Sequence, residues 1–330
     1  SCIRDKKSPK NIIFLIGDGM GVDQVYAALT AKKGNLEMAR CPITGFVKTD
    51  AADNYITDSA AGATAFATGT KTNNGLLSIG PFGDTLQTLI EIAELNGLAT
   101  GLVATSKITH ATPAGYISHN ISRDNYEEIA LDFLKTDIDV FIGGGRNNFE
   151  VRTDSLNLSD ILRQRNYNVV YDIEGVKSIT QGKLAGLLYP DHPPKYTEGR
   201  NDMLEVSALK AVELLDIYES GFFLMIEGSQ IDWGGHDKDS EYLVAEAVDF
   251  DNVVGKILDF AEKDGETLVV ISADHETGGY SIIGGDIKTG EVQGVFTTGD
   301  HSAVMVPLFA YGPGAEQFSG IQENTDIFHK

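Results

Sequence analysis

The chain is organised around Tyr55-Ile-Thr-Asp58-Ser59-Ala-Ala-Gly-Ala-Thr64-Ala-Phe-Ala-Thr-Gly69, where a serine behind an aspartate opens a run of alanine and glycine. Such small side chains let a helix pack very close to a sheet. The first N–H groups of this helix point outward past the serine, and helix starts of this kind favour anions. The residues alone also fit a simpler interpretation, in which Asp58 or Ser59 is only the N-cap.

A buried strand is predicted upstream of this stretch. Residues 11–16 form a continuous apolar run of strand length, which is typical of a parallel strand buried on both faces, and Asp18 follows between two glycines. An acid at the carboxyl end of a central strand points into the usual ligand crevice of an open α/β sheet. Asp18 alone would also fit an ordinary turn aspartate.

Two later strands repeat this pattern. Residues 221–228 contain Glu227 near their end, and residues 267–272 lead into Asp274 and His275. One acid at a strand end is weak evidence for a site, whereas three in a series are hard to explain as surface charge. We therefore expect these side chains to contribute to one functional site.

The remaining candidates lie between the strands. Asp232 and His236 are four residues apart, a spacing that lets both face one metal from a helical turn or a compact loop. A loop past a strand end carries His110 and Thr112. Arg123 by itself would fit an ordinary solvated arginine, but a guanidinium near a phosphate-sized anion site is the favoured group for bidentate recognition.

Apolar spacing predicts further strands at residues 44–50, 98–105, 139–145 and 306–311, and helices at residues 85–96, 202–219 and 240–264, with another helix beginning at residues 121–124. Residues 147–202 are more polar and irregular, which predicts a surface excursion. His192 lies in it, and loop histidines usually bind nothing. The run Gly143-Gly144-Gly145 lacks the lysine and hydroxyl of a P-loop and is interpreted as structural.

Composition narrows the class of protein. The chain has 330 residues, 42% of them hydrophobic, which is enough for a sizeable core. The formal net charge of −22 opposes non-specific binding to nucleic acids or anionic membranes. No apolar run approaches the ~18 residues of a membrane helix. No signal peptide is evident, so we expect a mature or trimmed chain.

Two cysteines, Cys2 and Cys41, are too few for a disulfide framework. We expect residues 1–10 to be an N-terminal tether and residues 11–330 to be a single catalytic domain. Because the first mature residue of a bacterial lipoprotein is a cysteine, Cys2 would be a lipid-attachment site. A stray terminal thiol fits equally well.

Metal ligands, a serine and an arginine make up the candidate site. Its members are Asp18, Asp58, Ser59, His110, Thr112, Arg123, Glu227, Asp232, His236, Asp274, His275 and His301. Nitrogen plus carboxylate ligands suit zinc, and a set of oxygen ligands suits magnesium. Two clustered metals with a serine and an arginine describe phosphoryl transfer better than acyl transfer.

The sequence resembles the alkaline phosphatases in six motifs that together are highly specific. These motifs are Gly17-Asp18-Gly19-Met20-Gly21, Asp58-Ser59-Ala-Ala-Gly-Ala-Thr-Ala, Ala111-Thr112-Pro113-Ala114, Glu227-Gly-Ser-Gln-Ile-Asp232, Ala273-Asp274-His275 and Gly299-Asp300-His301. The likeness spans roughly residues 11–311. It implies an α/β fold, a three-layer αβα sandwich around a mostly parallel central sheet.

The resemblance also implies roles. One zinc is held by Asp232, His236 and His301. A second zinc is held by Asp18, Asp274 and His275, with Ser59 as its fourth ligand. A magnesium is held by Asp18, Thr112 and Glu227, and Arg123, steadied by Asp58, binds the phosphate. Ser59 would then form a phosphoserine that water hydrolyses. Phosphate monoesters and inorganic phosphate are the implied ligands, and a homodimer in the periplasm or cell envelope is the implied setting.

Two positions depart from the best-known bacterial pattern. His110 stands where an aspartate occurs, and Trp233 stands where a lysine occurs. Both are expected beside the third metal and the phosphate, so the identity of that metal is left open. Only 25 residues separate His275 from His301, where larger relatives insert a crown subdomain. We therefore expect a compact member of the family.

Other classes of protein remain as alternatives. A phosphodiesterase of the same superfold would usually present threonine as nucleophile and lack Arg123, and a sulfatase would need a proline and arginine after its nucleophile. A non-catalytic envelope protein that binds metal or phosphate would be expected to have lost Ser59 or Arg123. A sugar-phosphate mutase would need a gating domain for which the chain hardly has room.

Overall fold

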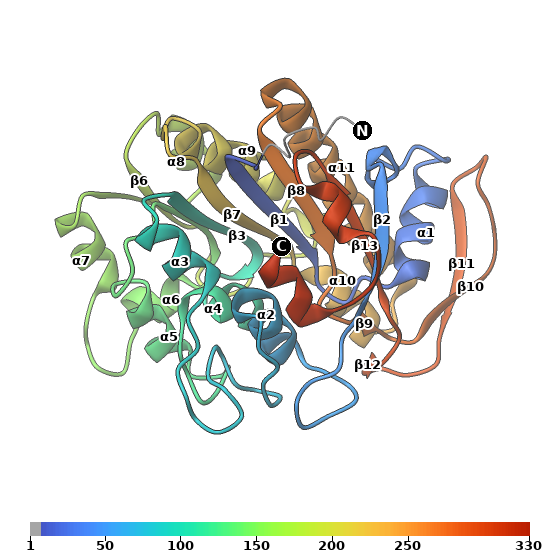
Figure 1. Ribbon diagram of the computed structural model, residues 1–330, viewed down its shortest axis with the longest axis horizontal. Coiled ribbons are helices and arrows are strands. Elements are labelled where there is room, and N and C mark those ends of the chain that lie inside the picture. Colours follow the sequence, from blue (N-terminus) through green and yellow to red (C-terminus); the bar gives the residue numbers. More distant parts are fainter. Residues whose placement is uncertain (1–7) are drawn as a thin grey trace, which may run out of the picture.

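A ten-stranded sheet forms the centre of the fold (Figure 1). The computed structural model describes residues 8–330, so the Cys2 prediction and most of the predicted tether lie outside the described residues. The strand order is β14-β2-β13-β8-β1-β7-β3-β4-β6-β5. Only β13 runs antiparallel to its neighbours in this described sheet, which confirms the prediction of a mostly parallel sheet.

The strands of this sheet have the following bounds: β1 Asn11–Gly17, β2 Ile43–Lys48, β3 Ala99–Lys107, β4 Val140–Gly144, β5 Tyr167–Val170, β6 Lys183–Leu187, β7 Phe222–Gly228, β8 Thr267–Ser272, β13 Val306–Tyr311 and β14 Gly320–Glu323. The apolar runs predicted as buried strands became β1, β7 and β8, which lie side by side at the centre. A continuous apolar run suits this position because helices cover both faces of the sheet.

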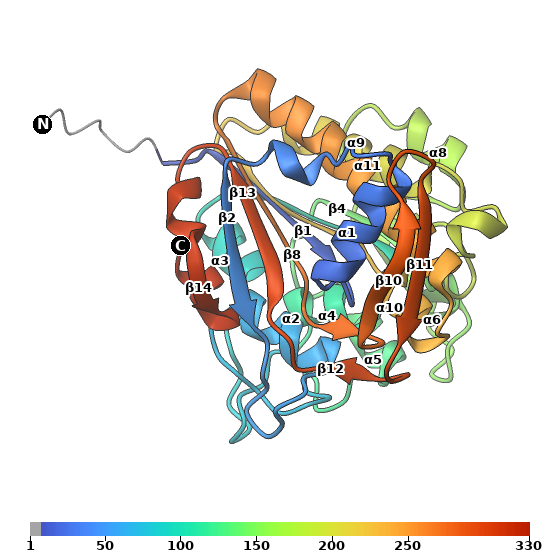
Figure 2. The ribbon, with the colours of Figure 1, turned by 90° about the vertical axis from the view of Figure 1, so that its right-hand side faces the viewer.

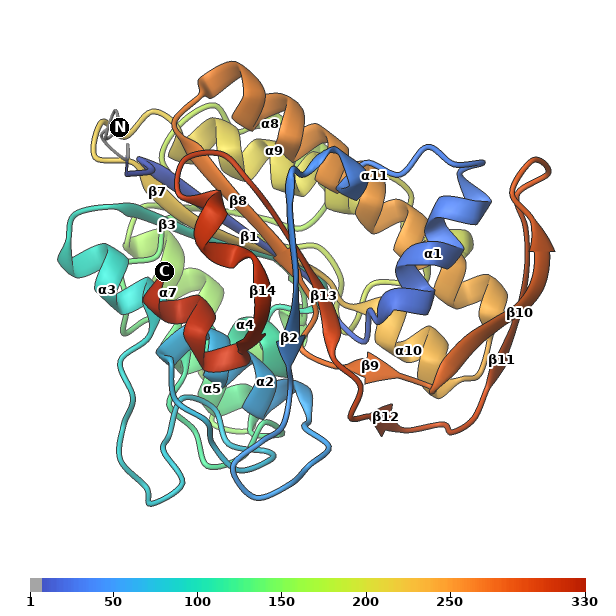
Figure 3. The ribbon, with the colours of Figure 1, turned by 45° about the vertical axis from the view of Figure 1, so that its right-hand side comes forward.

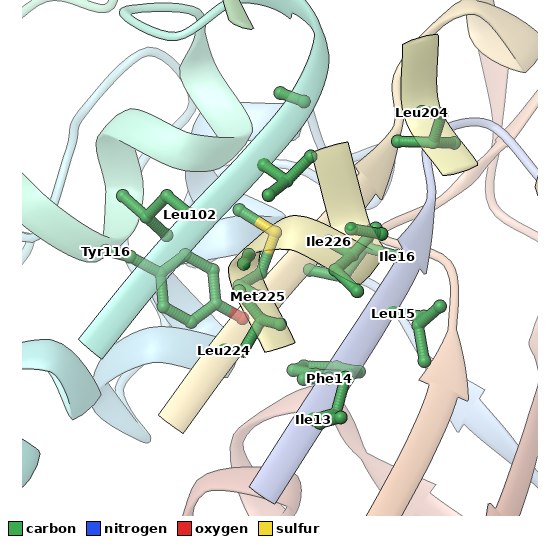
Figure 4. Close-up of a cluster of buried hydrophobic side chains, with 14 of the residues drawn as sticks. Ile13, Phe14, Leu15, Ile16, Leu102, Tyr116, Leu204, Leu224, Met225 and Ile226 are labelled. Carbon is green, nitrogen blue, oxygen red and sulfur yellow. The ribbon is translucent and has the colours of Figure 1, made fainter. Parts of the chain in front are cut away.

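Helices pack on both faces, which completes three layers (Figures 2 and 3). One face carries α1 (Val22–Ala31), α9 (Met203–Leu215) and α11 (Ser240–Asp264), and the other carries α2 (Ser59–Thr68), α3 (Leu89–Leu95) and α4 (Ala111–Ile117). Figure 4 shows side chains of β1 and β7 packed together with Leu102 of β3, Tyr116 of α4 and Leu204 of α9. This arrangement confirms the predicted three-layer αβα sandwich.

Smaller elements complete the chain: α5 Tyr126–Asp132, α6 Arg146–Glu150, α7 Leu158–Gln164, α8 Ile173–Ser178, α10 Gln230–His236, β9 Glu276–Thr277, β10 Tyr280–Asp286, β11 Glu291–Phe296 and β12 His301–Ser302, with 3-10 turns at Met38–Arg40, Tyr196–Glu198, Ala315–Phe318 and Asn324–His329. The interval between His275 and His301 holds β9 and the β10–β11 hairpin. Among residues 8–330 no helix is both long and apolar enough to cross a lipid bilayer. Cys41 is a buried free thiol.

The structure corrects three expectations about local structure. Residues 147–202 are not a surface excursion, because β5 and β6 extend the main sheet at its edge. The sequence pattern of these two strands is weak because both are short and the edge strand β5 is mostly half-buried. The helix predicted at residue 121 begins only at Tyr126, because the chain around Arg123 pairs with Gly75 instead. Thr112 lies in the first turn of α4 and not in a loop.

Candidate active site

The carboxyl ends of three adjacent parallel strands bring three acids together. β1 lies between β7 and β8, and Ile16 is in register with both Glu227 and Ser272. Asp18 follows β1, Glu227 is the next-to-last residue of β7, and Asp274 lies two residues after the end of β8. All three side chains are fully buried. The sheet therefore gathers carboxylates that lie more than 40 residues apart in the sequence.

Asp18, Asp274 and His275 form the first group, here called the His275 cluster. One potential ligand atom from each lies within 4.8 Å of the others. The His275 Nε2 atom is 3.2 Å from Asp274 Oδ2 and 3.5 Å from Asp18 Oδ1. Asp274 Oδ1 accepts N–H bonds from Gly19 and His275, so its other oxygen is left for the cluster.

Ser59 reaches the His275 cluster from the start of α2. Its Oγ lies 3.3 Å from His275 Nε2, and the residue is only 2% exposed. Asp58 is indeed the N-cap and accepts the Ala61 N–H at 2.9 Å, and the role of Ser59 as a nucleophile stays a prediction. A Cβ added at Gly62 would lie 3.0 Å from Asp274 Cβ. The glycine therefore allows α2 to approach the strand end closely.

Asp232, His236 and His301 form the second group, the His301 cluster. Asp232 and His236 come from α10, which settles the choice between a helical turn and a loop. The Nε2 atoms of His236 and His301 lie 3.3 and 3.4 Å from Asp232 Oδ1 and 3.2 Å from each other. His236 Nδ1 lies 2.7 Å from the backbone oxygen of Gly299, and His301 Nδ1 lies 2.8 Å from that of Thr57.

These carbonyls hold the imidazoles for metal binding. A carbonyl accepts only a protonated nitrogen, so in the neutral rings both Nε2 atoms carry lone pairs that face each other. Such a pair beside a carboxylate is the donor arrangement of a zinc site. The His275 and His301 rings are stacked with centroids 3.5 Å apart, so the two clusters are neighbours.

Asp18, His110 and Glu227 form the third group, the Glu227 cluster, whose ligand atoms also lie within 4.8 Å of one another. Glu227 Oε2 accepts hydrogen bonds from Ser229 and, more weakly, Ser106. His110 was predicted beside this site and not among its ligands. The structure places it in the cluster itself, and Thr112 is buried nearby in α4.

Buried polar atoms in these clusters lack partners. Among the described residues no hydrogen bond reaches either Asp18 carboxylate oxygen, Asp274 Oδ2, Glu227 Oε1, His110 Nδ1 or Thr112 Oγ1. Leaving so many buried polar atoms unsatisfied is costly, and native structures rarely do so without an ion or water. The residues present therefore fit divalent cations.

Burial and mutual repulsion raise the pKa values of three acids in these clusters. Burial raises the pKa of Glu227 to about 7, and burial with the charge of Asp232 raises the pKa of Asp274 to about 6. The pKa of Asp18 lies well above its usual value because of its burial and, next, the charge of Asp274. Burial would also raise the pKa of Asp232, but hydrogen bonds from His236 and His301 hold it well below its ordinary value.

Arg123 lies between the serine helix and the Glu227 cluster. Its Nη1 donates to Asp58 Oδ2 at 3.0 Å, and the Gly75 N–H donates to the same oxygen. Its Nη2 lies 3.5 Å from His110 Nε2. The solvated interpretation of Arg123 is therefore wrong, because the guanidinium is mostly buried and anchored by the N-cap of α2.

Two residues at the site were missed or dismissed in the sequence. Thr277 Oγ1 donates to Asp232 Oδ1 and lies 3.2 Å from His275 Nδ1, so it bridges two clusters. Its position two residues after His275 was the available signal. His192 lies against Trp233 and His110, with ring centroids 4.7 and 5.5 Å away. No local sequence pattern predicts that His192 belongs to the site, because its loop is far in sequence from both His110 and Trp233.

A serine beside neighbouring candidate cation sites, at the edge of a three-layer αβα sandwich, is typical of metal-dependent α/β hydrolases. Comparison with known proteins narrows this class. The family model for alkaline phosphatase matches residues 9–294. The chain therefore belongs to the alkaline phosphatase family, and it is a phosphoric monoester hydrolase that uses metal cofactors.

Individual relatives agree over nearly the whole chain. "Alkaline phosphatase 3" of Bacillus subtilis is 34% identical and is matched over 96% of this chain and 87% of its own length. The solved alkaline phosphatase of the Antarctic bacterium TAB5 is 41% identical, with a TM-score of 0.94, over 98% of this chain and 97% of that one. A histidine-to-glutamate variant of the TAB5 enzyme, with a TM-score of 0.92 and 40% identity over the same shares, has been solved with Mg bound in its M3 site.

Proposed function

We propose that this phosphatase hydrolyses phosphate monoesters through a phosphoserine on Ser59, with zinc in the His275 and His301 clusters. The observation that carries this proposal is the position of Ser59 Oγ, 3.3 Å from His275 Nε2 at the N-terminus of a buried helix. When bound, the two metals would supply Lewis-acid chemistry that activates a serine hydroxyl and stabilises a leaving alkoxide.

The residues of the chain prepare the attack. The α2 backbone holds Ser59 at the helix start, where free N–H groups favour the negative charge of a phosphate. Asp58 holds one edge of the Arg123 guanidinium, which leaves other N–H donors for the phosphoryl oxygens. Burial of the site keeps these donors in a fixed orientation, so little reorganisation is needed during the reaction.

A direct test looks for the covalent intermediate. The metal-loaded protein would be incubated with inorganic phosphate, quenched in acid and digested, and the peptide containing Ser59 would be analysed by mass spectrometry. We expect the added mass of one phosphoryl group on Ser59. A phosphoryl group on another residue, or none at any phosphate concentration, would contradict the proposal.

Magnesium in the third site, with Asp18, Thr112 and Glu227 as ligands, stays a prediction. His110 adds an imidazole nitrogen to the Glu227 cluster, and nitrogen ligands suit zinc better than magnesium. The Mg bound in the M3 site of the histidine-to-glutamate TAB5 variant supports the same direction. We propose that an acid in place of His110 would favour magnesium.

We expect the double variant His110→Asp with Trp233→Lys to tighten inhibition by inorganic phosphate. The aspartate supplies an oxygen ligand for magnesium, and the lysine adds a positive charge beside the phosphate. The inhibition constant of inorganic phosphate would be measured with saturating magnesium for both single variants and the double variant. An unchanged constant in the double variant would refute this prediction.

We expect Arg123→Ala to lower kcat/KM by about 10- to 100-fold, because a charge-assisted hydrogen bond is worth about 1.5–3 kcal/mol. Arg123→Lys should recover only part of the loss, since an ammonium group cannot form the bidentate contact. Arg163→Ala, a change of an exposed arginine on α7, serves as the matched control. Wild-type activity of the Lys variant would argue against bidentate recognition.

The alternatives predict other products. A phosphodiesterase would hydrolyse bis-p-nitrophenyl phosphate faster than the monoester, a mutase would release an isomerised sugar phosphate, and a non-catalytic binding protein would release nothing. Rates on a monoester and a diester, with product analysis, separate these cases. The homodimer, the envelope location and lipid attachment at Cys2 stay predictions, and sedimentation of the purified protein would test the first of them.

A further inference from the structure

Two features of the sequence, the glycine run at residues 143–145 and His192, have no role in the proposed mechanism. The structure joins them. A Cβ added at Gly144 would lie 2.3 Å from Asp191 O and 2.8 Å from Pro193 Cδ. The glycine run therefore lets the segment that contains His192, residues 188–194, lie directly on the carboxyl end of β4.

Backbone hydrogen bonds hold this segment in place. The N–H groups of Gly145, Arg146 and Asn147 donate to the carbonyls of Asp191, Tyr189 and Pro190 at 2.9–3.0 Å. From the other side the Gln230 side chain donates to Pro193 O at 3.0 Å. Gln230 lies in α10, the helix that carries two members of the His301 cluster. The segment is thus tied to the start of α6 (Arg146–Glu150) and to α10, and the second of these carries part of the site.

The His192 ring has a defined orientation. Its Nδ1 accepts the backbone N–H of Lys107 at 3.1 Å, next to the end of β3. The ring then meets Trp233 edge to face, with centroids 4.7 Å apart at 85°, and meets His110 at 5.5 Å and 79°. His110 and Trp233 are also in edge-to-face contact, at 6.0 Å and 84°. The three rings form one packed aromatic triad.

We propose that His192 is a positioning residue that, together with Trp233, holds the His110 ring toward Asp18 and Glu227 and so determines metal binding in the Glu227 cluster. Buried His110 Nδ1 has no hydrogen-bond partner in the described chain, and Nε2 makes only the 3.5 Å contact with Arg123. Neither nitrogen is therefore firmly tied to a protein group, and ring packing orients this candidate ligand. The inference rests on the proposed third metal site.

Two variants of His192 distinguish the contribution of its ring from that of its hydrogen bond, and a third variant serves as a control. His192→Asn keeps an acceptor for the Lys107 N–H but removes the ring. His192→Phe keeps a ring of similar size but removes the acceptor. His329→Asn changes an exposed histidine near the C-terminus and serves as the matched control. Thermal unfolding of each variant verifies that it is folded.

Tryptophan fluorescence can report on metal binding in this protein. Trp233 is the only tryptophan in the sequence, so emission excited at 295 nm reports on this triad alone. Zinc and magnesium would be titrated separately into the protein with its first two sites filled, and Trp233 emission would be recorded. Metal content after dialysis and the inhibition constant of inorganic phosphate would be measured on the same samples.

We expect His192→Asn to weaken metal binding in the Glu227 cluster by about 10- to 100-fold, the usual effect of removing a group that orients a ligand, and to alter Trp233 emission. His192→Phe should restore most of the affinity. If the wild type holds three metals and His192→Asn binds the third metal as tightly as the wild type, the inference about His192 is wrong while the proposed third site stands. A wild type that holds only two metals under all conditions would overturn the proposed third site, and the inference with it.

Discussion

Ser59→Ala is expected to lower the rate of p-nitrophenyl phosphate hydrolysis at alkaline pH by at least about 1,000-fold, because removal of a nucleophile eliminates the covalent route. The Oγ atom lies at the start of α2 against His275 Nε2, whereas the hydroxyl of Thr277 lies on the other side of that ring, at Nδ1. Alanine fits the same buried position without strain, so the fold should be retained.

Metal content decides how the loss is interpreted. The purified Ser59→Ala protein should keep about two zinc ions per chain, because three other candidate ligands of the His275 cluster remain. Ser207→Ala is the matched control, since Ser207 is buried in the helix α9 and its hydroxyl has no partner among residues 8–330. A Ser59→Ala enzyme with near-normal activity and full metal content would contradict the phosphoserine mechanism.

Removal of the metals by a chelator is expected to abolish activity and to destabilise the protein more at pH 8 than at pH 5. Burial raises the pKa of Glu227 from its ordinary 4.5 to about 7, and that of Asp274 to about 6. These carboxyls therefore lose their protons at lower pH in the unfolded chain than in the folded one. The metal-free protein must lose stability as the pH rises from about 4 to about 7.

Bound cations remove this penalty because they neutralise the ionised carboxylates, and metal binding itself strengthens as the ligands deprotonate. The difference in melting temperature between metal-loaded and metal-free protein should accordingly grow from pH 5 to pH 8. Glu227→Gln is the control, since it removes one titrating group at constant shape and should flatten the pH dependence of the metal-free form. Equal destabilisation at both pH values would show that the buried acids do not carry this effect.

Local sequence patterns predicted much of the fold. The apolar runs before Asp18, before Asp274 and around Glu227 have the composition of strands buried on both faces, and all three became central parallel strands. The edge strands β5 and β6 were missed because they are short and partly exposed, so they lack a continuous apolar run. The start of α5 was misplaced because Arg123 and its neighbours pair with the loop at Gly75, a contact that no local pattern shows.

The candidate site was likewise predicted from the sequence only in part. Residue type, spacing and position at strand ends were enough to single out these side chains as candidate ligands, because ligand chemistry and strand polarity are local properties. Their division into sets came from the family resemblance, which did not count His110 among the ligands. The place of His110 inside the Glu227 cluster, the anchoring of Arg123 by Asp58 and the Trp233–His192 contact depend on elements far apart in the sequence. The packing of α10 against the segment at residues 188–194 produces the Trp233–His192 contact, and the N-terminal end of α2 holds Asp58 beside Arg123.

The sequence by itself thus determined the class of chemistry and the central sheet, since both follow from which residues stand at the ends of apolar runs. The tertiary structure alone decided the environment of each ligand: which polar atoms stay unsatisfied, which imidazole nitrogens are held by carbonyls, and which rings pack on His110. Burial and long-range packing set these properties, and neither is encoded in the spacing of any single segment.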